Sequence, residues 1–128
     1  MITTHETEIR VRYQETDAQG RVHHANYLTW FELGRVELLR ANGMSYKSLE
    51  ATGIHLVIAE ANVKYFIPAD FDDLLTIKTT VTQAKGARIL HSYQVLRVNT
   101  ILAEGFTVAA CIDHSGRVTR LPEVLRLG

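Results

Sequence analysis

The residues between positions 13 and 27 include several that could carry out acyl transfer. Asp17 supplies a carboxylate that can attack a carbonyl carbon or take a proton from water. Gly20 permits a backbone turn that a side chain would hinder. His24 adds an imidazole, and the first-turn amides of a helix beyond it would stand unpaired at the positive end of the helix dipole. Together these groups provide a nucleophile or base, oxyanion donors and a polar helper.

The same residues also have a purely structural interpretation. An aspartate three residues before a glycine is commonly a turn residue. The adjacent His23 and His24 do not predict a metal site, because neighbouring side chains diverge and no HxxxH or CxxC pattern accompanies them. Tyr27 suits a core or an interface as well as a binding site. The residues by themselves therefore indicate a polar loop before a helix, and no metal.

The elements that must position this run are a strand before it and a helix after it. Alternating polar and apolar residues predict a strand over residues 7–13, with Ile9, Val11 and Tyr13 on its buried face. Residues 14–26 break the alternation and are expected to form a loop.

From Tyr27 the apolar residues recur at helical spacing, which predicts a helix of about four turns. The apolar positions are Leu28, Phe31, Leu38 and Leu39. Asn26 is expected to cap the start of this helix, and Gly43 suits the left-handed position after its end. Gly34 lies inside the helix, where glycine is unfavourable, so we expect it to permit close approach to a sheet.

The remainder of the chain predicts a short helical turn over residues 45–51 and then four strands. The predicted strands are residues 55–67, 74–84, 88–98 and 102–112. The short links Lys85-Gly86 and Asn99-Thr100 predict hairpins, so the last three strands should be antiparallel neighbours. The fold class is therefore α+β, with one long helix against an antiparallel five-stranded sheet. One helix cannot cover such a sheet completely, and we expect a homo-oligomer.

The length of 128 residues predicts a single domain over residues 1–128. Fourteen basic and fourteen acidic residues cancel, so neither nucleic acid nor an anionic membrane is expected as a partner. Cys111 is the only cysteine and lies in an apolar stretch, as a buried thiol in a reducing compartment would. No signal-peptide pattern or membrane-spanning segment is recognisable, and we expect a cytoplasmic protein.

The run from Tyr13 to Arg35 resembles the motif of the 4-hydroxybenzoyl-CoA thioesterase family, including its Tol–Pal-associated acyl-CoA thioesterases. The matching residues are Tyr13, Glu15, Thr16, Asp17, Gly20, Val22, His24, Asn26, Tyr27, Phe31, Glu32 and Arg35. The resemblance extends more weakly to residues 65–68, to the Asp72-Asp73 pair and to Leu121-Pro122. It implies a hotdog fold, dimers or tetramers, and an active site at a subunit interface, with the tetramer favoured.

The resemblance also implies roles for individual residues. Asp17 matches the catalytic carboxylate, acting as nucleophile or as general base on water. His24 matches the position whose backbone amide binds the thioester oxygen. Gly20 and Asn26 complete the substrate-binding turn. No metal, flavin or nicotinamide motif is recognisable in the sequence, so we expect hydrolysis without a cofactor.

The sequence only partly restricts which acyl group the protein could accept. His23 and His24 stand where the aromatic-specific enzyme has bulky aromatic residues, which favours a short aliphatic or broad acyl group. Aromatic groups such as hydroxybenzoyl or naphthoyl remain open. Tyr27, Val57 and Ile58 are the expected lining residues.

Lys85 and Arg88 are our candidates for contacts with the CoA phosphates, because they lie at a predicted hairpin. The alternative for both is a solvated turn.

Three functions are compatible with this family. The first is hydrolysis of an acyl-CoA thioester to free acid and CoA. The second is a hotdog dehydratase or hydratase, whose acid-base arrangement the run from Asp17 to Asn26 does not resemble. The third is a non-catalytic acyl-CoA-binding or regulatory protein, in which the carboxylate of Asp17 would be expected to be absent.

Overall fold

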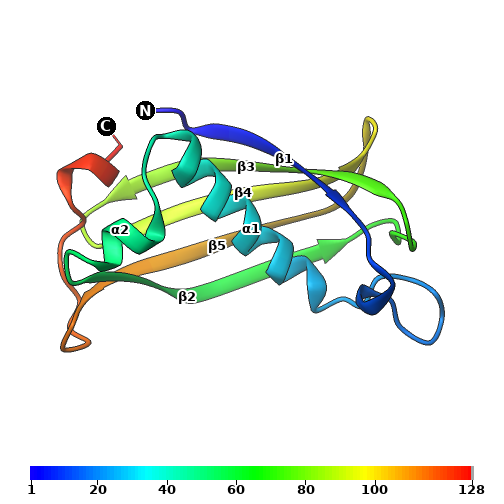
Figure 1. Ribbon diagram of the computed structural model, residues 1–128, viewed down its shortest axis with the longest axis horizontal. Coiled ribbons are helices and arrows are strands. Elements are labelled where there is room, and N and C mark those ends of the chain that lie inside the picture. Colours follow the sequence, from blue (N-terminus) through cyan, green and yellow to red (C-terminus); the bar gives the residue numbers. More distant parts are fainter. Residues whose placement is uncertain (128) are drawn as a thin grey trace.

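The computed structural model describes residues 1–127, in which five strands form one antiparallel sheet of order β1-β3-β4-β5-β2. The strands are β1 (Thr4–Arg10), β2 (Ile54–Tyr65), β3 (Leu74–Lys85), β4 (Arg88–Arg97) and β5 (Thr100–Asp113). The helices are α1 (Asn26–Ala41) and the short α2 (Tyr46–Glu50), with 3-10 turns at Tyr13–Glu15 and Glu123–Leu125. Helix α1 crosses one face of the sheet (Figure 1). The predicted α+β class, five-stranded sheet and long helix are confirmed.

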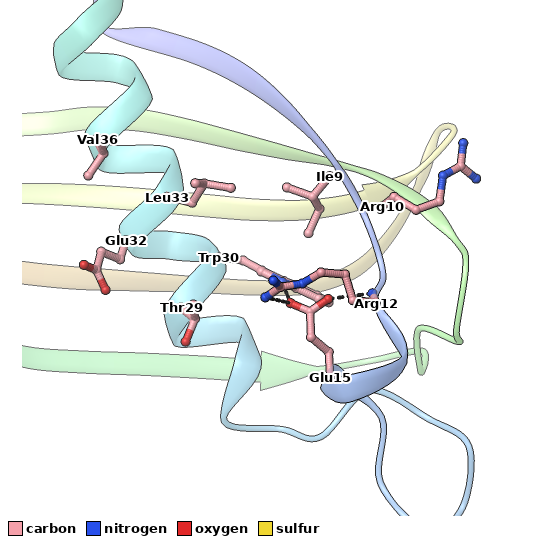
Figure 2. A pocket seen from close by; sticks show the side chains of 9 residues that line it. All are labelled: Ile9, Arg10, Arg12, Glu15, Thr29, Trp30, Glu32, Leu33 and Val36. Atoms are coloured by element: carbon pink, nitrogen blue, oxygen red, sulfur yellow. Dashed lines mark hydrogen bonds and ion pairs between the residues drawn. The ribbon is translucent and has the colours of Figure 1, made fainter.

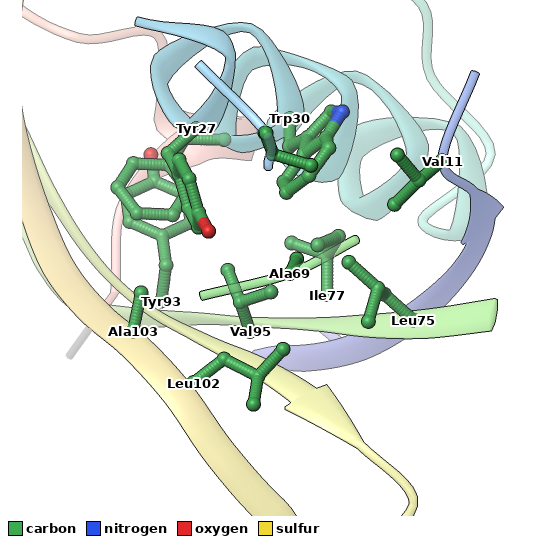
Figure 3. Close-up of a cluster of buried hydrophobic side chains, with 12 residues drawn as sticks. Val11, Tyr27, Trp30, Ala69, Leu75, Ile77, Tyr93, Val95, Leu102 and Ala103 are labelled. Atoms are coloured by element: carbon green, nitrogen blue, oxygen red, sulfur yellow. The ribbon is translucent and has the colours of Figure 1, made fainter. Parts of the chain in front are cut away.

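The main core lies between α1 and the sheet. Figure 3 shows Tyr27 and Trp30 from α1 above Ile77 of β3 and Val95 of β4. Phe31 of α1 is fully buried and stacks on Tyr93 of β4, with ring centroids 4.1 Å apart. The prediction that Leu28 belongs to the buried apolar face of the helix is wrong, because Leu28 is 43% exposed. Tyr27 and Trp30 take its place, since the α1 face toward the sheet begins one residue earlier.

Gly34 is buried on the face of α1 that packs against β3. A β-carbon at this position would collide with the hydroxyl oxygen of Thr79, a fully buried residue of β3. The expected close approach of helix and sheet at Gly34 is therefore confirmed. The absence of a side chain at Gly34 lets α1 pack closely against the sheet at this point.

Strand β1 ends earlier than the alternation predicts. The last residue of β1, Arg10, pairs with Leu74, which is the first residue of β3. With no strand left to pair with, the chain turns through the 3-10 segment after Val11. Val11 is buried as expected, but Tyr13 is 76% exposed and does not belong to a buried strand face. The chain is thereby free to form the loop that precedes α1.

The other strand boundaries agree with the predictions to within a few residues. The hairpin between β4 and β5 turns at Val98 and Asn99, one residue before the predicted link, and Val98 adopts a positive φ of 58°. Cys111 is fully buried on β5, in a second apolar cluster with Leu121 and Leu125 of the C-terminal segment. That segment, for which the sequence shows no strong pattern, therefore packs against the sheet.

Strand β2 forms one edge of the sheet and is poorly covered. Residues 57–62 are exposed, including the apolar side chains of Val57 and Ile58. An exposed, apolar edge strand presents unpaired backbone groups to another chain. In the described chain, no helix is long and apolar enough to span a membrane.

Candidate active site

Asp17 lies in a tight turn of the loop between β1 and α1. Its backbone N–H donates to the carbonyl of Arg21 at 2.7 Å, and its carbonyl accepts from the N–H of Gly20 at 3.0 Å. Its Oδ1 accepts from the N–H of Gln19 at 2.8 Å and of Arg21 at 3.4 Å. Gly20 completes the turn with a φ of 81°. Asp17 is thus a turn residue whose Oδ1 is held by the backbone, while its Oδ2 has no hydrogen-bond partner within residues 1–127.

The amides that follow His24 are paired, which corrects the expectation that they are free. The N–H of Ala25 donates to Nδ1 of His23 at 3.1 Å, and that of Asn26 donates to the carbonyl of His23 at 3.0 Å. The N–H of Tyr27 lies 3.4 Å from the carbonyl oxygen of His24. From His23 to Tyr27, only the N–H of His24 has no acceptor in the described structure. The loop therefore leaves one amide available to an oxyanion, at the position that the family resemblance indicates.

Asn26 does not cap α1 with its side chain, contrary to the prediction. The residue before the helix is Ala25, and the ring and carbonyl of His23 already accept from the first amides. The side-chain amide of Asn26 instead donates to the backbone carbonyl of Glu15 at 2.8 Å. Asn26 thus ties the first turn of α1 to the start of the loop.

Tyr65, the last residue of β2, closes the site from the other side. Its hydroxyl donates to the carbonyl of His24 at 2.8 Å. Its ring packs edge to face on Tyr27, with centroids 5.0 Å apart. Partial burial raises the pKa of Tyr65, so the hydroxyl keeps its proton and remains a donor.

These groups surround a cavity of about 270 Å³ at one end of the sheet. Its lining comprises Asp17, Arg21, Val22, His24, Tyr27, Tyr65, Phe66, Ile67 and Pro68. Of the predicted site residues, Asp17, His24 and Tyr27 line it, and Gly20 shapes the turn beneath Asp17.

Sequence reasoning did not assign Arg21 or the segment from Tyr65 to Ile67 to the site. The available signal was an aromatic and apolar run just before Pro68, at the end of a predicted strand.

The remaining predicted residues lie elsewhere in this chain. Ile58 lines a separate cavity of about 240 Å³ between α1, α2 and β2. Lys85 and Arg88 face each other at the β3–β4 hairpin, at the end of the sheet opposite the Asp17 loop (Figure 1). Strand β3 has 12 residues, which at ~3.3 Å per residue separates its two ends by roughly 36 Å. Within one chain, these residues do not meet Asp17.

Comparison with known proteins identifies the family of this chain. The model of the thioesterase-like superfamily matches residues 11–127. The chain is 37% identical to the acyl-CoA thioesterase YbgC of Haemophilus influenzae over 106 residues, which are 82% of this chain and 78% of that protein. It is 35% identical to the acyl-CoA thioester hydrolase YbgC of Shigella flexneri, covering 82% of this chain and 79% of the relative.

Solved structures give the same result. A probable thioesterase from Bartonella henselae superposes with a TM-score of 0.87 at 35% identity, covering 93% of this chain and 99% of that one. A DHNA-CoA thioesterase from Staphylococcus aureus superposes with a TM-score of 0.90 at 30% identity, covering 94% of this chain and 82% of that one. The hotdog fold is confirmed, and the chain belongs to the thioesterase-like superfamily.

Proposed function

We propose that this protein is an acyl-CoA thioesterase, which hydrolyses an acyl-CoA thioester to a free acid and CoA. The observation that carries the proposal is the pairing of two groups on one cavity: the carboxylate of Asp17 and the unpaired N–H of His24. A carboxylate and a preorganised oxyanion donor are the minimum that thioester hydrolysis needs. The curated relatives named as acyl-CoA thioesterases support the same reaction.

In this mechanism the thioester carbonyl oxygen accepts a hydrogen bond from the N–H of His24, where the start of α1 stabilises developing negative charge. Two routes then lead to the same products. In the first, Oδ2 of Asp17 bonds to the carbonyl carbon, the carbon–sulfur bond breaks, CoA leaves as a thiolate that is protonated, and water hydrolyses the resulting anhydride. In the second, Asp17 takes a proton from water as the oxygen of that water attacks, and the proton passes to the departing sulfur.

The acyl group that we propose is short and either aliphatic or aromatic. The cavity holds about 270 Å³, and its wall includes the exposed side chains of Phe66 and Ile67 beside the ring of Tyr27. These side chains accept an alkyl chain or a ring by apolar contact. One structural neighbour, at 30% identity, is a DHNA-CoA thioesterase. We therefore include aromatic acyl groups among the proposed substrates.

We further propose a homo-oligomer in which two β2 edges pair. An antiparallel pairing would bring the Val57–Ile58 part of one strand beside the Tyr65 end of its partner, and hence beside the Asp17 cavity. Val57, Ala110 and Arg88 occupy one row across β2, β5 and β4, and Lys85 extends that row onto β3. The second copy would therefore bring Val57 and the two cations to the site on one face of the sheet, and Ile58 on the opposite face, which carries α1. A tetramer would join two such dimers. The buried, unpaired Cys111 fits the reducing cytoplasm that we propose as its location.

The test is a thiol-release assay with benzoyl, hydroxybenzoyl, naphthoyl and straight-chain CoA esters, comparing wild type with Asp17→Asn. We expect kcat to fall at least about 100-fold in the variant, the scale for loss of a positioned base or nucleophile. Equal, slow thiol release by both proteins would overturn the proposal. Tight acyl-CoA binding without release would indicate a binding protein, and conversion without thiol release would indicate a hydratase or dehydratase.

Light scattering tests the oligomer. We expect a mass of two or four chains, and Ile58→Lys should lower it by placing a charge on the paired edge. A monomer that retains full activity would contradict the shared site.

A further inference from the structure

Glu15 is a buried carboxylate outside the catalytic pair, and both of its oxygens are engaged. Its side chain lies at the end of a groove of about 520 Å³ between β1 and α1 (Figure 2). Oε1 accepts from the backbone N–H of Arg12 at 2.7 Å, and Oε2 accepts from the indole N–H of Trp30 at 2.9 Å. The residue is only 5% exposed. Burial by itself would raise the pKa of Glu15, but these two hydrogen bonds, together with a third from the guanidinium of Arg12 and its positive charge, hold the pKa below its usual value.

The backbone carbonyl of Glu15 is engaged as well, by the other end of the loop. It accepts from the N–H of His23 at 2.8 Å and from the side-chain amide of Asn26 at 2.8 Å. The side chain of Glu15 thus joins Arg12, at the start of the 3-10 turn that follows β1, to α1. Its backbone carbonyl joins the same point to His23 and Asn26, on either side of His24. These contacts close the loop that carries Asp17.

Few other contacts hold the rest of the loop: Arg21 forms a β-bridge with Asp70, and the carbonyl of His24 accepts from the hydroxyl of Tyr65. Residues 17–21 are exposed, and the hydrogen bonds of Asp17 are made within the turn itself. The relative position of Asp17 and the N–H of His24 therefore depends in large part on where Glu15 and Val22, at the two ends of the exposed segment, are held. Val22 is buried, and its N–H donates to the carbonyl of Ala69, which holds the His24 side of the exposed segment in place. Glu15 secures the other.

We propose that Glu15 is a positioning residue for the hydrolysis, which keeps the Asp17 carboxylate and the His24 amide aligned through its contact with Trp30. The inference rests on the proposed thioesterase activity. A buried carboxylate is costly unless it is fully hydrogen-bonded, and here one oxygen accepts from Arg12 at the start of its own 3-10 turn and the other from Trp30 of α1. Misplacement of catalytic groups by about 1 Å can lower a rate by about 100-fold, so a modest shift of this loop would reduce turnover.

The experiment compares wild type with Glu15→Gln and Trp30→Phe in two measurements. The first is steady-state thiol release, in which we expect kcat to fall by about 10-fold or more while KM changes by less than about 3-fold. The second is hydrogen exchange at the amides of residues 16–25, which we expect to accelerate in both variants. Trp30→Phe removes the N–H donor but keeps an aromatic ring, so it serves if Glu15→Gln does not fold.

The matched control is Thr107→Val, which removes a buried hydroxyl that lies 2.5 Å from the hydroxyl of Tyr93, within the core. It should lower the denaturation midpoint without changing kcat or the exchange of the loop. If folded Glu15→Gln and Trp30→Phe keep wild-type kcat and loop exchange, or if Thr107→Val lowers kcat as much as they do, the positioning role is overturned. If wild type releases no thiol, the proposed function fails, and loop exchange still reports whether Glu15 holds the loop.

Discussion

Tyr65 donates its hydroxyl to the backbone carbonyl of His24 at 2.8 Å, across 41 positions of sequence. The bond joins the end of an edge strand to the loop before α1. It fixes the peptide plane that follows His24, while Glu15 fixes the N–H of His23 on the other side. The candidate oxyanion donor is therefore held from two elements that the chain order places far apart.

Replacing Tyr65 by phenylalanine should lower kcat for thioester hydrolysis by about 3- to 10-fold, because one neutral hydrogen bond contributes about 1 kcal/mol. The ring and its packing on Tyr27 would remain. Steady-state thiol release measures the effect. Tyr13→Phe is the matched control, since Tyr13 is exposed and its hydroxyl makes no hydrogen bond within residues 1–127. Equal kcat in the two variants would show that the Tyr65 hydroxyl has no role in the site.

Gly20→Ala should reduce activity more than its effect on stability explains. Gly20 has a φ of 81°, so alanine there is strained although no atom lies within 4 Å of the added carbon. We expect a loss of about 1 kcal/mol of unfolding free energy and a lower kcat, as the turn beneath Asp17 shifts. Urea denaturation and thiol release are the measurements. Gly116→Ala has the same strain at φ 85° in an equally open turn, and should lose the stability but not the activity.

Gly34→Ala should destabilise the protein by about 1 to 3 kcal/mol, because the added carbon would overlap the Thr79 hydroxyl in a packed core. The denaturation midpoint reports the loss. The double variant with Thr79→Ala should recover part of it, since that hydroxyl is buried without a hydrogen-bond partner. If the two substitutions were additive, the helix–sheet contact at Gly34 would not be the cause.

Stability should decrease in mild acid because of His91. This residue is 6% exposed on β4, its Nδ1 has no partner among the described residues, and burial together with the charge of Arg35 lowers its pKa from 6.5 to about 4. The unfolded chain takes up a proton near pH 6.5, whereas the folded chain resists it until about pH 4. The contribution of His91 is therefore unchanged above pH 6.5 and declines between 6.5 and 4.

Between pH 7.5 and pH 5, this loss amounts to about 2 kcal/mol of unfolding free energy. Urea titrations at the two pH values measure it. His91→Gln should remove most of the difference, and His114→Gln, at an exposed histidine, should leave it in place. An unchanged pH dependence in His91→Gln would mean that other groups are responsible.

The strands and the helix were predictable because their determinants are local. Alternation over Leu75, Ile77 and Thr79 follows directly from the two-residue period of a strand, and all three are fully buried as that period requires. Tyr13 was placed wrongly because alternation continues in the sequence after the partner strand has ended. Leu28 was placed wrongly because spacing predicts an apolar face but not the direction in which the helix presents it.

The sequence by itself determined which groups the candidate site contains: a carboxylate at Asp17, a glycine turn at Gly20 and a helix start just after His24. These depend on residue types within one short segment. Only the tertiary structure decided which amide is free, since the donors from Ala25 to Tyr27 are consumed by the ring and carbonyl of His23 and by the carbonyl of His24. The tertiary structure alone brought Tyr65 from the end of β2 to the candidate site, because the arrangement of the strands, rather than distance along the chain, places its hydroxyl against His24.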